Sequence, residues 1–226
     1  MSATAPPGSR GDPHAGQPVL WLGPPLPRAR LAVILVHGRG ASAEEILTLA
    51  EAFGVGDVAY AAPQAAGNTW YPHSFLAPLE QNEPGLGSGL RVLSELVGHL
   101  DRHGVAAHRV GLLGFSQGAC LALEFAARHT RRYAAVIGLS GGLIGPPGTL
   151  RAYAGSLEGT AVLLGCGDVD PHIPLERVHE SADVFRRLGA AVDERIYRRM
   201  GHSVNQDEIQ AVHDLLTTVP AVHGDR

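Results

Sequence analysis

The stretch VGLLGFSQGAC (residues 110–120) joins an apolar run to a segment with helical periodicity, and the rest of the chain can be interpreted outward from it. Residues Gly114 to Gly118 match the pattern GxSxG, in which a strained strand-to-helix turn lifts a serine hydroxyl above the edge of a sheet. Gly114 and Gly118 supply the small residues that such a turn needs, because neighbouring backbone crowds it. The stretch predicts that Ser116 is a nucleophile.

The helix expected at Gln117–Arg128 strengthens this interpretation. Its first turn points free N–H groups and the positive end of the helix dipole toward the place where an oxyanion forms during acyl transfer. A bare GxSxG match also occurs by chance in many chains, so a tight turn without a reactive serine remains the alternative at this point.

Apolar and periodic segments alternate along the chain on both sides of this stretch. Short apolar runs without alternation, typical of strands buried on both faces of a parallel sheet, lie at Leu31–Val36, Val58–Ala62, Val110–Gly114, Ala134–Leu139 and Ala161–Cys166. Helical periodicity appears at Ala43–Phe53, Ser88–His103, Gln117–Arg128, Leu175–Leu188 and Asp207–Thr217. The alternating run Val192–Tyr197 predicts a last strand at a less buried edge. The order predicts an α/β fold with helices on both faces of the sheet.

An HGRG turn, His37 to Gly40, follows the first buried strand. In the α/β-hydrolase fold a turn at this position aims a backbone N–H at the oxyanion, so we expect the amides of Arg39 and Gln117 to be the donors. We expect the His37 side chain to hold the turn by hydrogen bonds. The Arg39 side chain could attract a substrate anion or point to solvent while its amide binds the oxyanion, and we favour solvent.

The acid and the base of such a site follow the serine in the chain, in that order. The loop Cys166–Pro174 offers two carboxylates, Asp168 and Asp170, and we favour Asp170 because the proline after it restricts its backbone. Asp168 remains the alternative acid, its other role being to cap the turn. The base is His202, which follows the last predicted strand in the sequence MGHS.

A long connection, residues 68–86, leaves the carboxyl edge of the predicted sheet, where ligands bind in folds of this kind. We expect four of its apolar residues to bind substrate: Trp70, Tyr71, Phe75 and Leu76. The alternative is that they anchor the loop on the core.

The bulk properties set the limits of the interpretation. A chain of 226 residues fits one domain, expected at residues 19–226, preceded by a disordered leader at residues 1–18 that is rich in Gly, Pro, Ala and Ser. The formal net charge of −4, from 18 basic and 22 acidic residues, argues against a nucleic-acid partner. No run approaches the roughly 20 apolar residues of a membrane helix, which argues against stable membrane insertion.

Two cysteines are too few for a disulfide scaffold, and the 12 histidines show no metal-binding spacing, so we expect a cytoplasmic protein with no metal and no cofactor.

Four motifs in this order, HGRG, GFSQGA, GDVDPHIP and MGH, resemble the phospholipase/carboxylesterase family, which includes bacterial carboxylesterases and acyl-protein thioesterases. The resemblance implies an α/β-hydrolase fold with a mostly parallel sheet and no separate cap domain. It implies a triad of Ser116, Asp170 and His202, oxyanion amides at Arg39 and Gln117, and a small-molecule ester as substrate. A homodimer is compatible with it.

The sequence therefore predicts a serine carboxylesterase for short to medium acyl esters. The same residues could serve an acyl-protein thioesterase, a lysophospholipase or a lactone hydrolase. A non-enzymatic binding protein is disfavoured, because such a protein needs neither the triad nor the glycines of the turn.

Overall fold

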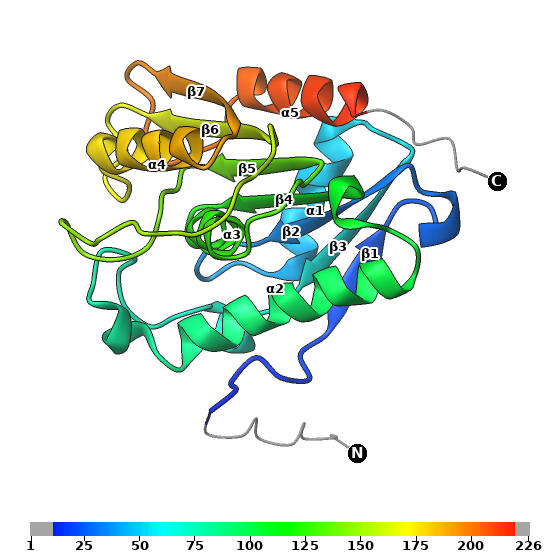
Figure 1. The fold of residues 1–226 in the computed structure, drawn as a ribbon, viewed down its shortest axis with the longest axis horizontal. Helices are drawn as coiled ribbons and strands as arrows, with labels where there is room; N and C mark the ends of the chain where they lie inside the picture. The colour runs from blue at the N-terminus through cyan, green and yellow to red at the C-terminus, as the bar shows by residue number, and fades with distance from the viewer. Residues whose placement is uncertain (1–10, 220–226) are drawn as a thin grey trace.

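The computed structural model describes residues 11–219, and its central feature is one seven-stranded sheet (Figure 1). The strands are β1 (Val19–Leu22), β2 (Leu31–Val36), β3 (Val58–Pro63), β4 (Val110–Phe115), β5 (Ala135–Leu139), β6 (Ala161–Gly167) and β7 (Ala191–Tyr197). Their order in the sheet is β1-β3-β2-β4-β5-β6-β7. Strand β1 runs antiparallel to β3, and every other neighbouring pair is parallel.

Helices cover both faces of the sheet, as Figure 1 shows. They are α1 (Ala43–Phe53), α2 (Gly85–Arg102), α3 (Gln117–Arg128), α4 (Leu175–Arg187) and α5 (Gln206–Thr218). Helices α2, α3 and α4 pack on one face with the even-numbered residues of β2, and α1 and α5 pack on the other with its odd-numbered residues. Every residue of β2 and β3 is buried, because each strand has a helix layer above and below. The predicted α/β architecture is confirmed.

The predicted strands and helices all exist, within a few residues of the expected bounds. Two differences have physical causes. Strand β1 is not predicted, because its four residues are too few to show a periodic pattern. It forms by antiparallel pairing with β3. Helix α2 begins at Gly85 rather than at Ser88. Gly85 packs closely on the main chain of Trp70, since a Cβ there would lie 2.7 Å from the Trp70 carbonyl oxygen. The first turn of the helix therefore contains glycine, a poor helix former, and its start is not visible in the sequence.

The connections add no further domain. Between β5 and β6, residues 140–160 contain neither helix nor strand, and the connection from β3 to α2 contains only two short 3₁₀ helices, Ala66–Asn68 and Leu79–Asn82. The expected absence of a cap domain is therefore confirmed for the described residues. In this part of the chain, only loops lie over the carboxyl ends of the parallel strands.

Residues 11–18 belong to the folded domain. His14 is only 3% exposed: its Nε2–H donates to the carbonyl of Trp70 (2.9 Å), and its Nδ1 accepts from the N–H of Ala66 (3.1 Å). Its own N–H donates to the hydroxyl of Ser88 (3.0 Å). The disordered leader predicted for residues 1–18 therefore does not extend over residues 11–18, because contacts with distant loops, invisible in composition, fix them. Residues 1–10 lie outside the described residues.

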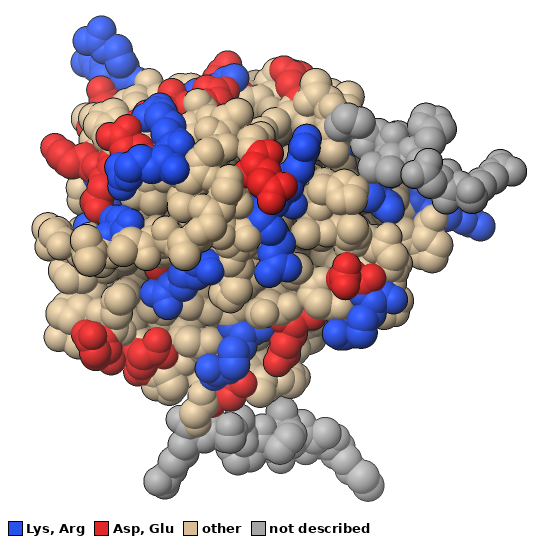
Figure 2. All heavy atoms as spheres, in the orientation of Figure 1, with Lys and Arg blue, Asp and Glu red and all other residues tan. Residues whose placement is uncertain are grey.

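The surface carries mixed charge on the face that Figure 2 shows, where basic and acidic side chains lie interspersed. None of the helices within residues 11–219 is both long enough and apolar enough to cross a membrane.

The His14 contacts generate a stability prediction. Burial lowers the pKa of His14, which keeps the ring neutral and lets Nδ1 accept its hydrogen bond. We expect His14→Ala to reduce the free energy of unfolding by about 2 kcal/mol at pH 7.5, measured by urea denaturation, because it leaves two buried backbone groups without partners. His108→Ala, which removes an exposed histidine, is the matched control.

The same contribution should weaken in acid. Since the folded-state pKa lies below the unfolded value of 6.5, the unfolded chain takes up the proton first, and the difference between wild type and His14→Ala should shrink as pH falls below about 6.5. Equal effects of the two histidine variants at pH 7.5 would contradict this role.

Candidate active site

The turn between β4 and α3 holds Ser116 in a strained conformation, with φ 56° and ψ −122°. A Cβ at Gly118 would lie 2.0 Å from the carbonyl oxygen of Val36, and one at Gly114 would lie 2.2 Å from the carbonyl oxygen of Gly118. Both positions therefore require glycine, as the motif predicts. The serine N–H donates to the carbonyl of Leu139 (3.0 Å), which ties the turn to the neighbouring strand.

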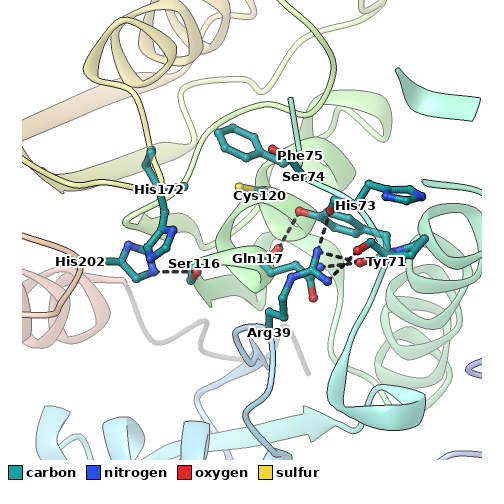
Figure 3. A pocket seen from close by; sticks show the side chains of 12 residues that line it. Arg39, Tyr71, His73, Ser74, Phe75, Ser116, Gln117, Cys120, His172 and His202 are labelled. Carbon is teal, nitrogen blue, oxygen red and sulfur yellow. Dashed lines mark hydrogen bonds between the residues drawn. The ribbon is translucent and has the colours of Figure 1, made fainter. Parts of the chain in front are cut away.

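Three residues far apart in the chain form one chain of hydrogen bonds. The Ser116 hydroxyl lies 2.8 Å from Nε2 of His202, and Nδ1 of the same ring lies 2.7 Å from Oδ2 of Asp170 (Figure 3 shows the first of these contacts). The Asp170 side chain is fully buried, whereas that of His202 is 18% exposed. The serine comes from the turn after β4, the aspartate from the loop after β6 and the histidine from the loop after β7.

Asp170 is held as a carboxylate by its surroundings. Its Oδ1 accepts from the N–H groups of His172 (2.8 Å) and Ile173 (3.1 Å), while Oδ2 faces His202. Burial alone would raise the pKa of Asp170, but the hydrogen bonds from His202 and from the two N–H groups outweigh it and hold this pKa below its ordinary value. The group is therefore ionised at neutral pH and favours Nδ1–H on the histidine.

Asp168, the alternative acid, lies elsewhere. It is exposed, and its Oδ1 accepts from the N–H of Arg199 (2.6 Å), a residue in the left-handed region at φ 59°. Its contact stabilises a turn, the second role that the sequence leaves open for it. The structure brings Asp170, and not Asp168, to His202.

The HGRG turn is held from inside by His37, which is fully buried. Its Nδ1–H donates to the carbonyl of Gly38 (2.8 Å), and its Nε2 accepts from the N–H of Ala65 (3.1 Å). Burial lowers the pKa of His37, so the ring stays neutral and can make both bonds. The predicted structural use of this histidine is confirmed.

The exposed Arg39 side chain makes hydrogen bonds that the sequence does not predict. Its Nη1 donates to the carbonyl of Pro72 (2.9 Å), and its Nη2 donates to those of Tyr71 (2.9 Å) and His73 (2.6 Å) (Figure 3). Arg39 is exposed, as expected, but its guanidinium is held by the loop instead of extending freely into solvent. Three carbonyl groups converge on it because residues 71–73 fold back over the HGRG turn, a long-range contact that the local sequence does not reveal.

Gln117 connects the same loop to the start of α3. Its Oε1 accepts from the N–H of Trp70 (2.9 Å), and its Nε2 donates to the carbonyl of Tyr71 (2.9 Å). No hydrogen bond within residues 11–219 uses the backbone N–H of Arg39 or of Gln117. Within this part of the chain, the two amides predicted to bind an oxyanion therefore have no hydrogen-bond partner and remain available next to Ser116.

A pocket of about 440 Å³ lies next to Ser116 and His202. It is lined by Arg39, Tyr71, Pro72, His73, Ser74, Phe75, Ser116, Gln117, Cys120, His172, Ile173 and His202. Two of the predicted substrate-binding residues, Tyr71 and Phe75, are in this lining.

The other two predicted substrate-binding residues, Trp70 and Leu76, are not in the lining. Trp70 is fully buried in the core, and its indole N–H donates to the carbonyl of His37 (3.0 Å). Leu76 is half-buried and packs against the same core cluster. Both fit the alternative that these residues anchor the loop.

Several lining residues were not singled out from the sequence. His172 and Ile173 follow Asp170 within its loop, and the His172 ring contacts the His202 ring edge to face at 4.8 Å. Cys120 also lines the pocket, one helical turn after Ser116 on the same face of α3, and for this residue the sequence does favour a small buried side chain over a nucleophile. Burial raises the pKa of the Cys120 thiol to about 12, so this thiol is not a nucleophile at neutral pH.

This combination defines the class of the protein. A serine on a strained turn between a parallel strand and a helix, with an acid and a histidine on later loops of the sheet, is the arrangement of the α/β-hydrolase fold.

The chain belongs to the phospholipase/carboxylesterase family, whose model matches residues 24–220. This places it among the serine hydrolases of that fold.

The comparisons with individual proteins agree. The crystal structure of a phospholipase/carboxylesterase from Dyadobacter fermentans superposes with a TM-score of 0.86 at 39% identity, covering 89% of this chain and 97% of that one. The structure of esterase PE8 gives a TM-score of 0.74 at 25% identity, covering 90% and 98%. Acyl-protein thioesterase 1 of Gibberella zeae is 30% identical over 119 residues, which are 50% of this chain and 49% of that protein. The curated relatives are matched over 44% to 60% of their own lengths.

Glu208 is fully buried in the first turn of α5, which follows the loop that carries His202. Its Oε2 accepts from the N–H of Asn205 (2.9 Å), completing a capping box at the start of α5. Its Oε1 is buried and has no partner among the described residues, and a Cβ at Gly165 would lie 2.2 Å from it. Burial raises the pKa of Glu208 to about 7.

This carboxyl predicts a pH-dependent stability. Since its folded-state pKa lies above the unfolded value of 4.5, its contribution is fully present below about pH 4.5 and is lost as pH rises through about 7. We expect Glu208→Gln to gain stability relative to wild type between pH 5 and 8, by on the order of 2 kcal/mol, measured by urea denaturation at each pH.

Glu176→Gln, which neutralises an exposed carboxylate in the first turn of α4, is the control. If the free energy of unfolding of wild type and of Glu208→Gln changed with pH in the same way, the raised pKa of the buried Glu208 carboxyl would be contradicted.

Proposed function

We propose that this serine hydrolase is a carboxylesterase that cleaves short to medium acyl esters through an acyl-enzyme on Ser116. The observation that carries the proposal is the unbroken chain of hydrogen bonds from Ser116 through His202 to Asp170, which faces an open pocket. A chain of this kind supplies a nucleophile, a base in contact with it, and a group that fixes the base.

In the first half of the reaction, Oγ of Ser116 attacks the ester carbonyl carbon while its proton passes to Nε2 of His202. The Asp170 carboxylate accepts the Nδ1–H and stabilises the imidazolium that forms. The negative oxygen of the tetrahedral intermediate is bound by the N–H groups of Arg39 and Gln117, which have no other partner within residues 11–219. The carbon–oxygen bond then breaks, and the leaving alcohol takes the proton from Nε2.

In the second half, water attacks the acyl-enzyme carbonyl, and Nε2 of His202 accepts the proton of that water. Collapse of the second tetrahedral intermediate breaks the bond to Oγ, and Ser116 recovers its proton from the imidazolium. The carboxylic acid leaves, and the free enzyme is restored. No cofactor takes part in these steps.

The walls of the pocket support a short to medium acyl group. Tyr71, Phe75 and Ile173 are buried residues that line it, and its volume of about 440 Å³ is small for a long lipid chain.

Substitution of the proposed triad tests the mechanism. With 4-nitrophenyl butyrate as substrate, we expect Ser116→Ala and Asp170→Asn each to lower kcat by about 10³-fold or more, because the first removes the nucleophile and the second removes the charge that stabilises the imidazolium. Asp168→Asn should change kcat by less than about threefold, because its carboxylate only accepts from a backbone N–H in a turn.

All three variants should keep the wild-type circular dichroism spectrum. If Asp168→Asn were as damaging as Asp170→Asn, or if Ser116→Ala kept its turnover, the assignment of the triad would fail.

A thioesterase is the second candidate, because three of the matched relatives are acyl-protein thioesterases and the same steps can expel a thiol in place of an alcohol. We expect kcat/KM to be higher for 4-nitrophenyl butyrate than for the palmitate, and higher for phenyl butyrate than for S-phenyl thiobutyrate once each is divided by its alkaline hydrolysis rate. A preference for palmitate, or for the thioester after this normalisation, would favour the second candidate.

A further inference from the structure

The charge around the pocket is one-sided. The lining contains one guanidinium, that of Arg39, and three imidazoles, those of His73, His172 and His202, but no Asp or Glu. Asp170, the nearest carboxylate of the site, lies behind His202 with its side chain fully buried and its oxygens occupied. A substrate in the pocket therefore meets positive charge and no exposed carboxylate of the lining.

The Arg39 charge is fixed in position but not neutralised. Its three hydrogen bonds go to uncharged main-chain carbonyls, and within residues 11–219 no acidic side chain lies in salt-bridge contact with it. A guanidinium has five N–H donors, so three such bonds leave two of them available. Other arginines near the site are paired: Arg177 and Arg151 both contact Glu180.

The guanidinium also lies close to the reacting group. The backbone N–H of the same residue is one of the two proposed oxyanion amides. The guanidinium borders the pocket together with Ser116, and Figure 3 shows it on the opposite side of Ser116 from His172. One substrate molecule can therefore place an ester at the serine and another group at the guanidinium. Because the guanidinium is the one lining side chain that is always charged, a single negative charge is its matching ligand.

From this geometry we infer that the enzyme prefers esters that carry a carboxylate, and that Arg39 determines this preference. The inference rests on the proposed esterase function and specifies its substrate class. A carboxylate is planar and singly charged, and it accepts the charge-assisted hydrogen bonds that a guanidinium donates.

The rival explanation is that Arg39 only fastens residues 71–73 to the HGRG turn. Such a role would affect charged and neutral esters equally, since it acts through the shape of the pocket. A selectivity ratio separates the two roles where a single rate does not.

The test uses two matched ester pairs in which a carboxylate replaces an isosteric, neutral carboxamide. In the first pair, 3-butyryloxybenzoate and 3-butyryloxybenzamide, the charge is on the alcohol side. In the second, the monophenyl ester of adipic acid and its terminal amide, the charge is on the acyl side. The quantity measured is the kcat/KM of the carboxylate member divided by that of the carboxamide member.

We expect wild type to favour the carboxylate in at least one pair by about tenfold at low ionic strength. Arg39→Gln should bring this ratio to near one, and Arg39→Lys should retain most of it. Arg28→Gln removes the same charge from the exposed 3₁₀ helix Leu26–Arg28, before β2 and remote from the carboxyl edge, and it should leave the ratio unchanged. A ratio near or below one in wild type for both pairs, or an unchanged ratio in Arg39→Gln, would overturn the inference.

Salt provides an arm that needs no variant, in case Arg39→Gln does not fold. Raising NaCl from 50 to 500 mM should lower the wild-type ratio several-fold, because ions screen a partly exposed guanidinium. A ratio that does not change with salt would count against recognition by charge. Turnover of these esters by Ser116→Ala would contradict the proposed function itself. Turnover that requires Ser116 but shows no preference for the carboxylate member would contradict the carboxylate inference alone.

Discussion

The contact on which the site depends is the close approach of α3 to β2 at Gly118. A Cβ there would lie 2.0 Å from the carbonyl oxygen of Val36, so only glycine allows the helix to start directly above the sheet. This approach forces the chain between β4 and α3 into a turn with Ser116 at φ 56°, and the seven-stranded sheet around it maintains the strain. The hydroxyl is thereby raised to the level at which the loops after β6 and β7 deliver Asp170 and His202.

The pocket beside the serine depends on a second set of contacts, made by three buried polar side chains and by the exposed side chain of Arg39. His14 and His37 bind the loop after β3 from below, while Gln117 and Arg39 bind its next residues from the side of α3 and the HGRG turn. The three buried side chains thereby supply hydrogen-bond partners to main-chain groups of the loop. The loop carries Tyr71 and Phe75 to the pocket, so the shape of the binding site follows from hydrogen bonds rather than from regular secondary structure.

The sequence predicts best what is locally encoded. The buried strands, the helices between them and the GxSxG turn follow from patterns within about 20 residues, and so does the choice of Asp170 beside Pro171. What it does not predict depends on partners far along the chain. His14 contacts residues 52 to 74 positions away, the Arg39 guanidinium binds carbonyls 32 to 34 positions away, and Trp70 turns into the core to meet His37. No periodicity or motif marks these contacts.

The central claim is that Ser116 is an activated nucleophile. The most direct measurement is mass spectrometry of the folded protein after reaction with a fluorophosphonate, which traps a serine that has a neighbouring base. The account predicts one adduct per chain, located by peptide mapping on Ser116 and absent from Ser116→Ala. No adduct on the folded protein, or an adduct on another residue that persists in Ser116→Ala, would contradict it.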